Sequence, residues 1–289
     1  MDFPFDILRI CLSLTYCNLS KRPHVFQRMT GLSVSEFQEI VYRVHPLWET
    51  SVESLKKSSG RWSILKTFED KVMSLLIYYR TYITHEFIGH LFGLHNSNVC
   101  RLFKKLEPLM GKRLAIKKDR TLIPEVILKL LADVTEQPIQ RPVKSHKRKK
   151  TYSGKKKRHT RKVEMIIQDN GKIMSVSHSH GGRKHDFRIR KEETPLPLNT
   201  EKYVDSGYQG LQKITSKVTL PFKRKKGQRL TKEQKQHNRK LASFRIKIEH
   251  KFREIKIFKI MSETYRNFGR KHHLRFNIIA GIINMKHGF

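Results

Sequence analysis

Apolar residues recur at helical spacing through the first third of the chain. Residues 1–60 read as modestly amphipathic helix, with one helix capped by Ser33 or Ser35 and continuing to Val44. Ser58-Ser59-Gly60 breaks this pattern, and residues 68–79 then carry a tighter helical period. The N-terminal part is therefore predicted to be all-helical.

Two short helices joined by a glycine turn follow. Thr84 caps the first, Gly93 makes the turn, and His95 opens the second, with Pro108 near its end. This outline, over about residues 67–110, is typical of a helix-turn-helix, although a plain helical hairpin has the same pattern. Asparagine suits adenine and arginine suits guanine in a major groove. The side chains predicted to face DNA are Asn96, Ser97, Asn98 and Arg101.

The period changes in the second half of the chain. Residues 126–131 predict a buried strand with Asp133 at its exit. Residues 162–167 and 172–176 predict two strands joined by a type I′ turn at Asn170-Gly171. A short helix at His185, a strand at 202–205 and helices at 231–260 and 274–285 follow. This order indicates an α/β or α+β domain.

Positive charge dominates the composition. The 289 residues include 61 Lys or Arg and 25 Asp or Glu, so the formal net charge is +36. Such a chain is expected to act beside a polyanion that neutralises it, and nucleic acid is the first expectation. Two basic runs, 141–162 and 223–240, contain one acid between them. They are predicted to contact phosphate. The alternative is that they are flexible, solvated charge that only keeps the chain soluble. The contacts singled out are Lys155, Lys156, Lys157 and Arg158.

The three cysteines form no CxxC pair, which argues against a disulfide framework or a structural zinc. His178, His180, His185 and His250 could suggest zinc, but no suitable cysteine or second histidine pair accompanies them. The apolar stretch at 7–14 is too short to span a bilayer. A soluble protein without a membrane partner is expected.

Carboxylates are scarce, so their positions are informative. Asp133 and Asp205 each lie where a strand is predicted to end, although an ordinary turn aspartate would look the same. Glu249 lies on the shoulder of a helical apolar stripe, beside Arg245 and Lys256. The simpler interpretation of Arg245 and Glu249 is a solvated ion pair. Asp186 is the rival to Asp205.

Three converging carboxylates repel one another unless a cation neutralises them. Oxygen ligands select Mg²⁺ or Mn²⁺, and two such ions support in-line phosphoryl displacement. Arg245 and Lys256 would then hold phosphates near the metals.

Five ordered motifs resemble those of the DDE transposases of bacterial insertion sequences, most closely the group related to the Harbinger elements. The resemblance runs from about residue 25 to the C-terminus. The motifs are Asp133-Val-Thr-Glu-Gln-Pro-Ile-Gln-Arg-Pro142, Tyr152-Ser-Gly-Lys-Lys-Lys-Arg-His-Thr160, His185-Asp-Phe-Arg188, Asp205-Ser-Gly-Tyr-Gln-Gly210 and Arg245-Ile-Lys-Ile-Glu-His-Lys-Phe-Arg253.

The resemblance implies an α/β fold: a ribonuclease-H-like mixed sheet flanked by helices, preceded by an all-α helix-turn-helix domain. The implied domains are residues 1–115 and 120–289. The family's acid triad falls on Asp133, Asp205 and Glu249, and its Arg and Lys fall on Arg245 and Lys256. A tyrosine of the family signature is replaced by Ala242, and a Gly or Ala after the first aspartate by Val134.

The implied protein binds inverted-repeat ends of its element, cleaves DNA by metal-assisted hydrolysis and joins the 3′-hydroxyl to target DNA. It uses two divalent ions, Mg²⁺ with Mn²⁺ as substitute. Its partners are double-stranded DNA and further copies of itself, as a homodimer or larger synaptic complex in the bacterial cytoplasm, on the nucleoid. Two alternatives remain: a Mg²⁺-dependent endonuclease without strand transfer, which uses the same acids, and a non-catalytic DNA-binding regulator.

Overall fold

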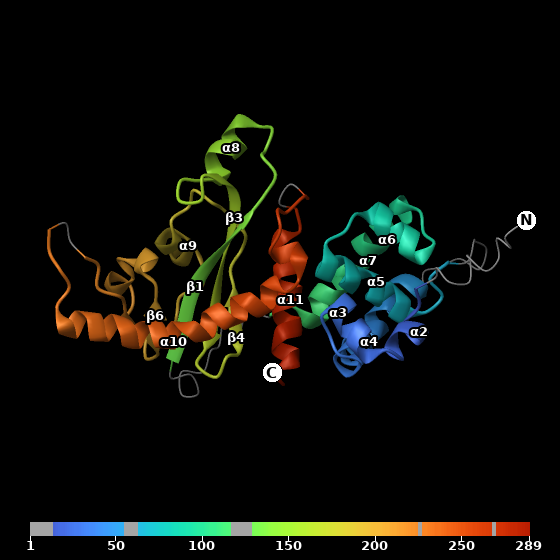
Figure 1. Ribbon diagram of the computed structural model, residues 1–289, viewed down its shortest axis with the longest axis horizontal. Helices are drawn as coiled ribbons and strands as arrows, with labels where there is room; N and C mark the ends of the chain where they lie inside the picture. Colours follow the sequence, from blue (N-terminus) through green and yellow to red (C-terminus); the bar gives the residue numbers. More distant parts are fainter. Residues whose placement is uncertain (1–13, 55–62, 117–128, 225–226, 268–269) are drawn as a thin grey trace, which may run out of the picture. The chain divides into compact units, whose positions relative to one another are not determined.

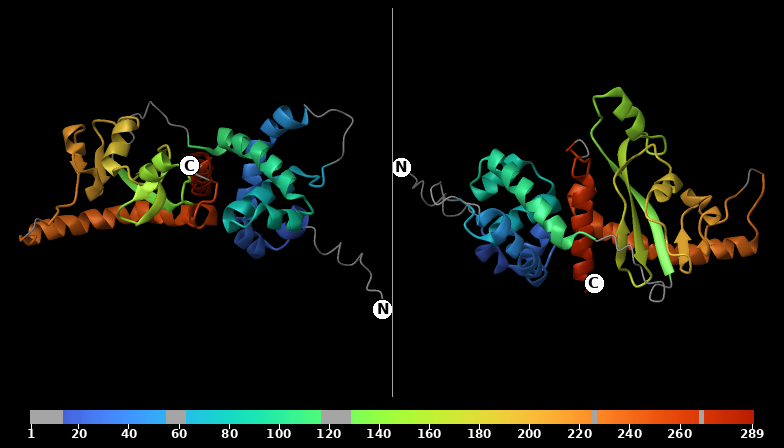
Figure 2. Two further views of the ribbon diagram at one scale, coloured as in Figure 1. Left: turned by 90° about the horizontal axis from the view of Figure 1, so that it is seen from above. Right: turned by 180° about the vertical axis from the view of Figure 1, so that it is seen from behind.

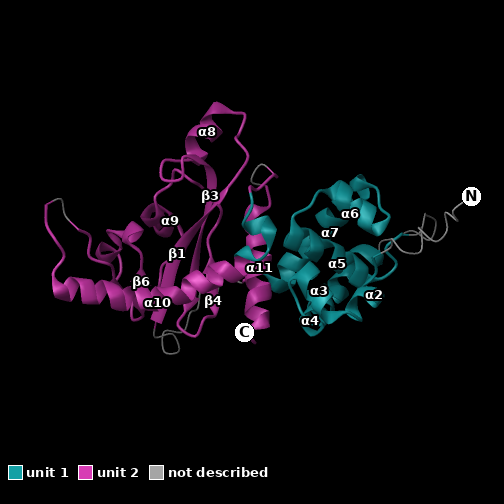
Figure 3. Ribbon diagram, viewed as in Figure 1, with its two compact units in different colours: residues 1–115, 256–263 teal, residues 116–255, 264–289 magenta. Residues whose placement is uncertain are grey.

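The computed structural model describes residues 14–54, 63–116, 129–224, 227–267 and 270–289. Two compact units divide the chain (Figure 3): residues 1–115 with 256–263 form unit 1, and residues 116–255 with 264–289 form unit 2. The break predicted at Ser58-Ser59-Gly60 and the start of the strand predicted at 126 lie outside the described residues. Residues 117–128, which contain most of the predicted domain boundary, also lie outside the described residues.

Unit 1 is all-helical, as its sequence period predicts. A capping box between Ser33 and Glu36 starts its α4 helix, which decides between the two predicted caps. Helix α5 is buried on nearly every side, so the other helices pack around it. The elements are α2 (Tyr16–Ser20), α3 (Pro23–Thr30), α4 (Val34–Trp48), η1 (Glu49–Glu53), α5 (Phe68–Thr81), α6 (His85–Phe92), α7 (Asn96–Leu114) and η4 (Lys259–Met261).

The turn between α6 and α7 requires two glycines. Gly93 has a φ of 64°, in the left-handed region. A Cβ atom on Gly89 would lie 2.3 Å from the carbonyl oxygen of Leu94, so only glycine allows the chain to fold back this closely. Helix α7 continues through Pro108 to Leu114, further than predicted, because Leu109, Met110 and Leu114 are buried beyond the proline.

Unit 2 is built on a mixed sheet in the order β2-β3-β1-β6-β7, with β4 and β5 also pairing with β3. Strand β1 runs antiparallel to β3 and parallel to β6, and β6 runs parallel to β7. The strands are β1 (Lys129–Pro138), β2 (Tyr152–Ser153), β3 (Arg158–Gln168), β4 (Ile173–Val176), β5 (His180–Gly181), β6 (Glu201–Val204) and β7 (Val218–Thr219).

Helices flank this sheet, and α10 runs along one of its faces (Figures 1 and 2). On the other face Ala132, Ile166 and Val204 form a core with Tyr208, against which Phe187 packs. The remaining elements are α8 (Ser145–Thr151), α9 (Asp186–Glu192), η2 (Ser206–Tyr208), η3 (Leu211–Lys213), α10 (Lys232–Lys256) and α11 (His272–Lys286). The predicted fold class, a ribonuclease-H-like mixed sheet flanked by helices and preceded by a helical region, is confirmed.

The hairpin between β3 and β4 differs in detail from the prediction. Gly171 has a φ of 92°, but Asn170 does not share the positive φ that a type I′ turn requires. The amide of Gly171 donates to the carbonyl of Gln168, and the amide of Gln168 donates to the carbonyl of Lys172. The loop is therefore a three-residue turn closed by a left-handed glycine.

None of the helices in the described ranges combines the length and apolar character needed to cross a membrane.

The Gly89 contact yields a test of the helix-turn-helix geometry. Gly89→Ala is expected to destabilise unit 1 by about 2 kcal/mol, because the new methyl overpacks against backbone. Denaturant unfolding followed by the fluorescence of buried Trp48 measures this change. His90→Ala, at the adjacent exposed position of α6, is the control and is expected to leave the midpoint nearly unchanged. Equal midpoints for the two variants would contradict the geometry.

Candidate active site

The strand register brings the two predicted aspartates together. Strands β1 and β6 pair in parallel up to Ala132 and Val204, so Asp133 and Asp205 are the next residues on neighbouring strands. Asp205 directly follows β6, as predicted. The prediction that Asp133 ends its strand is wrong, because β3 continues to pair with β1 as far as Pro138.

A single guanidinium from α10 bridges these two carboxylates. Nη1 of Arg245 donates to Oδ1 of Asp205 at 3.0 Å, and Nη2 donates to Oδ2 of Asp133 at 3.3 Å. Asp133 and Arg245 are about four-fifths buried, whereas the Asp205 side chain is 36% exposed. Nε of Arg245 is buried and has no hydrogen-bond partner among the described residues. The guanidinium is therefore held by the two aspartates.

The electrostatic surroundings of Asp133 combine opposing effects. Burial raises the pKa of Asp133, and the nearby Asp205 raises it further. The charge and hydrogen bond of Arg245 lower the pKa of Asp133 and so oppose both effects. Arg245 therefore favours the ionised form of Asp133.

Glu249 is not brought to this point. It is exposed on α10, four residues after Arg245, and no described hydrogen bond or ion pair joins it to either aspartate. Within the described part of the chain, no three Asp, Glu, His or Cys side chains lie close enough to hold a metal ion. Lys256, the last residue of α10, is also exposed. The structure thus joins two of the three predicted acids.

Asp186, the rival to Asp205, has a different partner. It begins α9, and its Oδ1 accepts a hydrogen bond from Nζ of Lys162 at 2.9 Å. Arg245 pairs with Asp205 instead. The geometry therefore favours Asp205 as the second acid of the site.

One buried acid went unpredicted from the sequence. Glu164 lies in β3 and is only 1% exposed, bound by Arg190 and Tyr208. Burial raises its pKa to about 7, although Arg190 and the hydrogen bond from Tyr208 both lower it. The available signal was one glutamate interrupting the apolar run of residues 163–167.

The donor set at the aspartates fits a divalent cation. Both groups are carboxylates, which hard ions such as Mg²⁺ and Mn²⁺ prefer. They already face one positively charged group, Arg245, on the same side of the sheet. Two carboxylates that share one cation can share another.

The predicted groove-facing residues lie in the first turns of α7. Asn96, Asn98 and Arg101 are exposed, and Ser97 is half-buried. The side-chain amide of Asn96 donates to Glu86 of α6, and Arg101 donates to Asn98 at 3.0 Å. These contacts tie the start of α7 to α6 and orient its polar side chains.

The basic residues 155–158 are all exposed in and after the turn that joins β2 to β3. A groove of 920 Å³ lies beside them. None of its described lining residues is acidic, and its cationic ones are Arg141, Arg148, Lys149, Lys157, Arg158 and Arg183. This surface is suited to a phosphate backbone.

Comparison with known families identifies the chain. Residues 132–284 match the model of the DDE superfamily endonucleases, and residues 64–116 match the helix-turn-helix of the same superfamily. The chain belongs to the DDE superfamily endonucleases. No solved structure matches it.

Two relatives of this DDE endonuclease are transposases by name. A probable transposase for insertion sequence element IS702 of Microchaete diplosiphon is 40% identical over 265 residues, covering 90% of this chain and 93% of the relative. A putative transposase for insertion sequence element IS112 of Streptomyces albus G is 24% identical over 266 residues, covering 90% and 94%. The resemblance stated from the motifs is confirmed.

The two matches correspond to observed elements of the DDE endonuclease. The helix-turn-helix match covers α5, α6 and α7, so the helix-turn-helix interpretation is confirmed over the helical-hairpin alternative. The endonuclease match runs from β1 to α11 and contains Asp133, Asp205 and Glu249. Both kinds of domain imply DNA as the partner.

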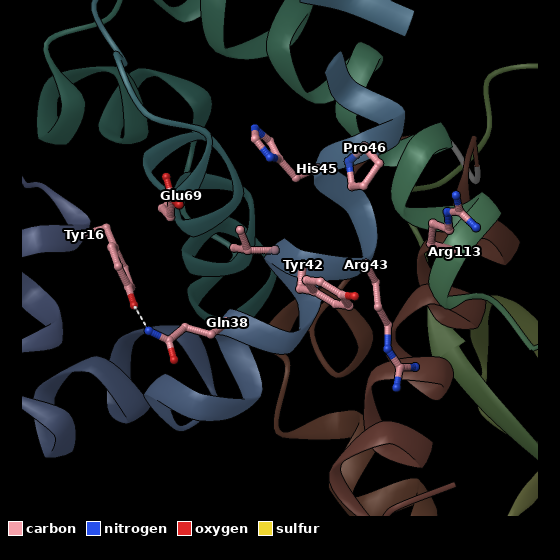
Figure 4. A pocket seen from close by; sticks show the side chains of 9 residues that line it. Tyr16, Gln38, Tyr42, Arg43, His45, Pro46, Glu69 and Arg113 are labelled. Carbon is pink, nitrogen blue, oxygen red and sulfur yellow. Dashed lines mark hydrogen bonds between the residues drawn. The ribbon is translucent and has the colours of Figure 1, made fainter. Parts of the chain in front are cut away.

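A pocket of 810 Å³ in unit 1 is lined mainly by α4, with Glu69 of α5 and Arg113 of α7 (Figure 4). Tyr16 and Gln38 hydrogen-bond at its edge, and Tyr42 and Arg43 of α4 also line it. It contains none of the predicted site residues.

Proposed function

We propose that the protein is the transposase of an insertion sequence. It binds the inverted-repeat ends of its element, cleaves DNA by metal-assisted hydrolysis and joins the freed 3′-hydroxyl to target DNA. The observation that carries this proposal is the pair of aspartates sharing one cation, Arg245, on the sheet of a DDE endonuclease. The similarity of this chain to a probable transposase, over 90% of its length, supports strand transfer over simple hydrolysis.

The proposed metal ligands are Asp133, Asp205 and Glu249. Two divalent ions, Mg²⁺ with Mn²⁺ as a substitute, would supply activation of a water or 3′-hydroxyl and stabilisation of the leaving oxygen. The two aspartates would hold the ions beside the sheet. Glu249 lies one helical turn after Arg245, on nearly the same face of α10, and is proposed as the third acid.

Arg245 has two successive roles in this proposal. Without metal it supplies the positive charge that the aspartates need. If a bound divalent ion supplied that charge, the guanidinium of Arg245 could bind a DNA phosphate in a bidentate manner. Lys256, exposed at the end of the same helix, is the second proposed phosphate contact.

Sequence-specific and sequence-independent DNA binding are assigned to different surfaces. We assign base contacts at the element ends to Asn96, Ser97, Asn98 and Arg101 at the start of α7. The sequence-independent grip on double-stranded DNA comes from residues 155–158 and the adjoining basic groove. Bringing two ends together requires a homodimer or larger assembly, acting on DNA of the bacterial nucleoid. The domains proposed for these tasks are residues 1–115 and 120–289.

A strand-transfer assay tests the acid triad. Pre-cut element ends with Mg²⁺ or Mn²⁺ are expected to give joined products with the wild-type protein. Asp133→Asn, Asp205→Asn and Glu249→Gln are each expected to lose at least about 100-fold in rate while still binding DNA, since each removes a metal ligand. Joined products and DNA binding are measured on the same gels.

The control is Glu254→Gln, which changes an acid of α10 that pairs with Lys251 and His287 instead. It is expected to retain activity. Cleavage without joining in the wild type would indicate the endonuclease alternative. DNA binding without either activity in any metal would indicate the regulator. Activity lost in Asp186→Asn and kept in Asp205→Asn would reassign the second acid.

The salt dependence of DNA binding tests the two surfaces. Replacing Lys155, Lys156, Lys157 and Arg158 by glutamine is expected to weaken binding to all sequences. The slope of log affinity against log salt becomes shallower by up to about 3.5, because four phosphate contacts are lost. Asn98→Ala is the contrasting variant, expected to relax sequence preference at an unchanged slope. An unchanged slope in the quadruple variant would contradict the grip assigned to this run.

A further inference from the structure

A buried polar cluster lies on the α9 face of the sheet, opposite the face that carries the proposed site. Its members are Glu164 of β3, Arg190 of α9 and Tyr208 of η2, which are 1%, 5% and 0% exposed. The Tyr208 hydroxyl donates to Oε1 of Glu164 at 3.0 Å, and Nη1 of Arg190 donates to Oε2 at 2.6 Å. Arg190 also donates to the carbonyl of Thr194.

Tyr208 connects this cluster directly to Asp205. The backbone amide of Tyr208 donates to the carbonyl of Asp205 at 3.0 Å, closing the turn that follows β6. The same residue is thus bonded to Asp205 through its amide and to Glu164 through its hydroxyl. The backbone of Asp205 cannot shift without moving a fully buried ring.

The two glycines of the Asp205-Ser-Gly-Tyr-Gln-Gly210 motif allow this turn to lie against α9. A Cβ on Gly207 would be 2.7 Å from Oδ2 of Asp186, and one on Gly210 would be 3.1 Å from the Phe187 ring. The His185-Asp-Phe-Arg188 motif therefore supplies the surface on which the Asp205 motif rests.

The cluster also reaches the strand of the first aspartate. Glu164 pairs with Val134 in the β1–β3 register, and its neighbour Met165 pairs with Asp133. Burial is the main cause that raises the pKa of the Tyr208 hydroxyl, and the charges of Glu164, Asp133 and Asp186 raise it further. One cluster is thus linked to both strands that carry the proposed metal ligands.

We infer that Glu164, Arg190 and Tyr208 form a positioning cluster that fixes Asp205 relative to Asp133, so that both carboxylates bind one divalent ion. This inference rests on the proposed function. Stability alone does not account for the cluster, because a buried ion pair is often no more stabilising than apolar residues of the same volume. Its geometric effect is specific, since Asp205 lies in a turn outside the strand hydrogen bonds and needs another anchor.

Tyr208→Phe tests the inference, because it removes the anchoring hydroxyl and keeps the ring in the core. The affinity for Mn²⁺ alone, by calorimetry, is expected to fall about tenfold. Cleavage of a DNA end in single turnovers is expected to require about tenfold more Mn²⁺, with saturating Mn²⁺ restoring most of the rate and DNA affinity unchanged. Such rescue by metal is not expected of a variant that is only less stable.

The matched control is Tyr79→Phe. Tyr79 is also fully buried, and its hydroxyl donates to another buried glutamate, Glu107, at 3.2 Å in unit 1. It loses a comparable hydrogen bond but is expected to keep wild-type Mn²⁺ affinity. Glu164→Gln, which keeps an acceptor for Tyr208, is a second variant and is expected to show a smaller Mn²⁺ effect.

Wild-type Mn²⁺ affinity and metal dependence in folded Tyr208→Phe would overturn the positioning role while leaving the proposed function intact. Equal losses in Tyr208→Phe and Tyr79→Phe would also overturn it, because the effect would then be general destabilisation. A wild-type protein that neither binds Mn²⁺ nor cleaves DNA would contradict the proposed function, and the positioning role with it.

Discussion

The attraction between one guanidinium and two carboxylates is the interaction on which this site depends. Parallel pairing of β1 and β6 places Asp133 beside Asp205, and burial raises the pKa of Asp133. Arg245 reaches both from the helix that runs along that face. Because the positive charge comes from the chain itself, the two acids can be held ready for a divalent ion without one being present.

The two faces of the sheet have different roles. The face that α10 follows carries the proposed chemistry, and the α9 face carries the core that anchors it. Tyr208 joins the faces, since its ring lies in the core while its amide holds Asp205. A sheet suits this arrangement because successive residues of a strand point to opposite sides.

Local sequence signals predicted much of this molecule, and long-range pairing explains what they missed. Thr84 and Gly93 mark the helix-turn-helix, and Asp205 follows its strand as expected, because caps and turns depend on neighbouring residues. Asp133 was expected at a strand end, but hydrogen bonding with the long strand β3 extends β1 beyond Asp133 to Pro138. The hydrogen bond between Arg245 and Asp133 joins residues 112 positions apart, so the sequence around neither residue predicts it. Likewise, Glu164 was missed because its partners come from other elements.

The proposed function requires that Arg245 and a divalent ion compete for the same two carboxylates. The most direct measurement is a calorimetric Mn²⁺ titration of the wild type and Arg245→Met without DNA, with Asp133→Asn beside them. Arg245→Met is expected to bind Mn²⁺ at least about tenfold more tightly than the wild type, because the competing cation is gone, and Asp133→Asn is expected to bind it far more weakly. Equal or weaker Mn²⁺ binding by Arg245→Met would contradict the claim.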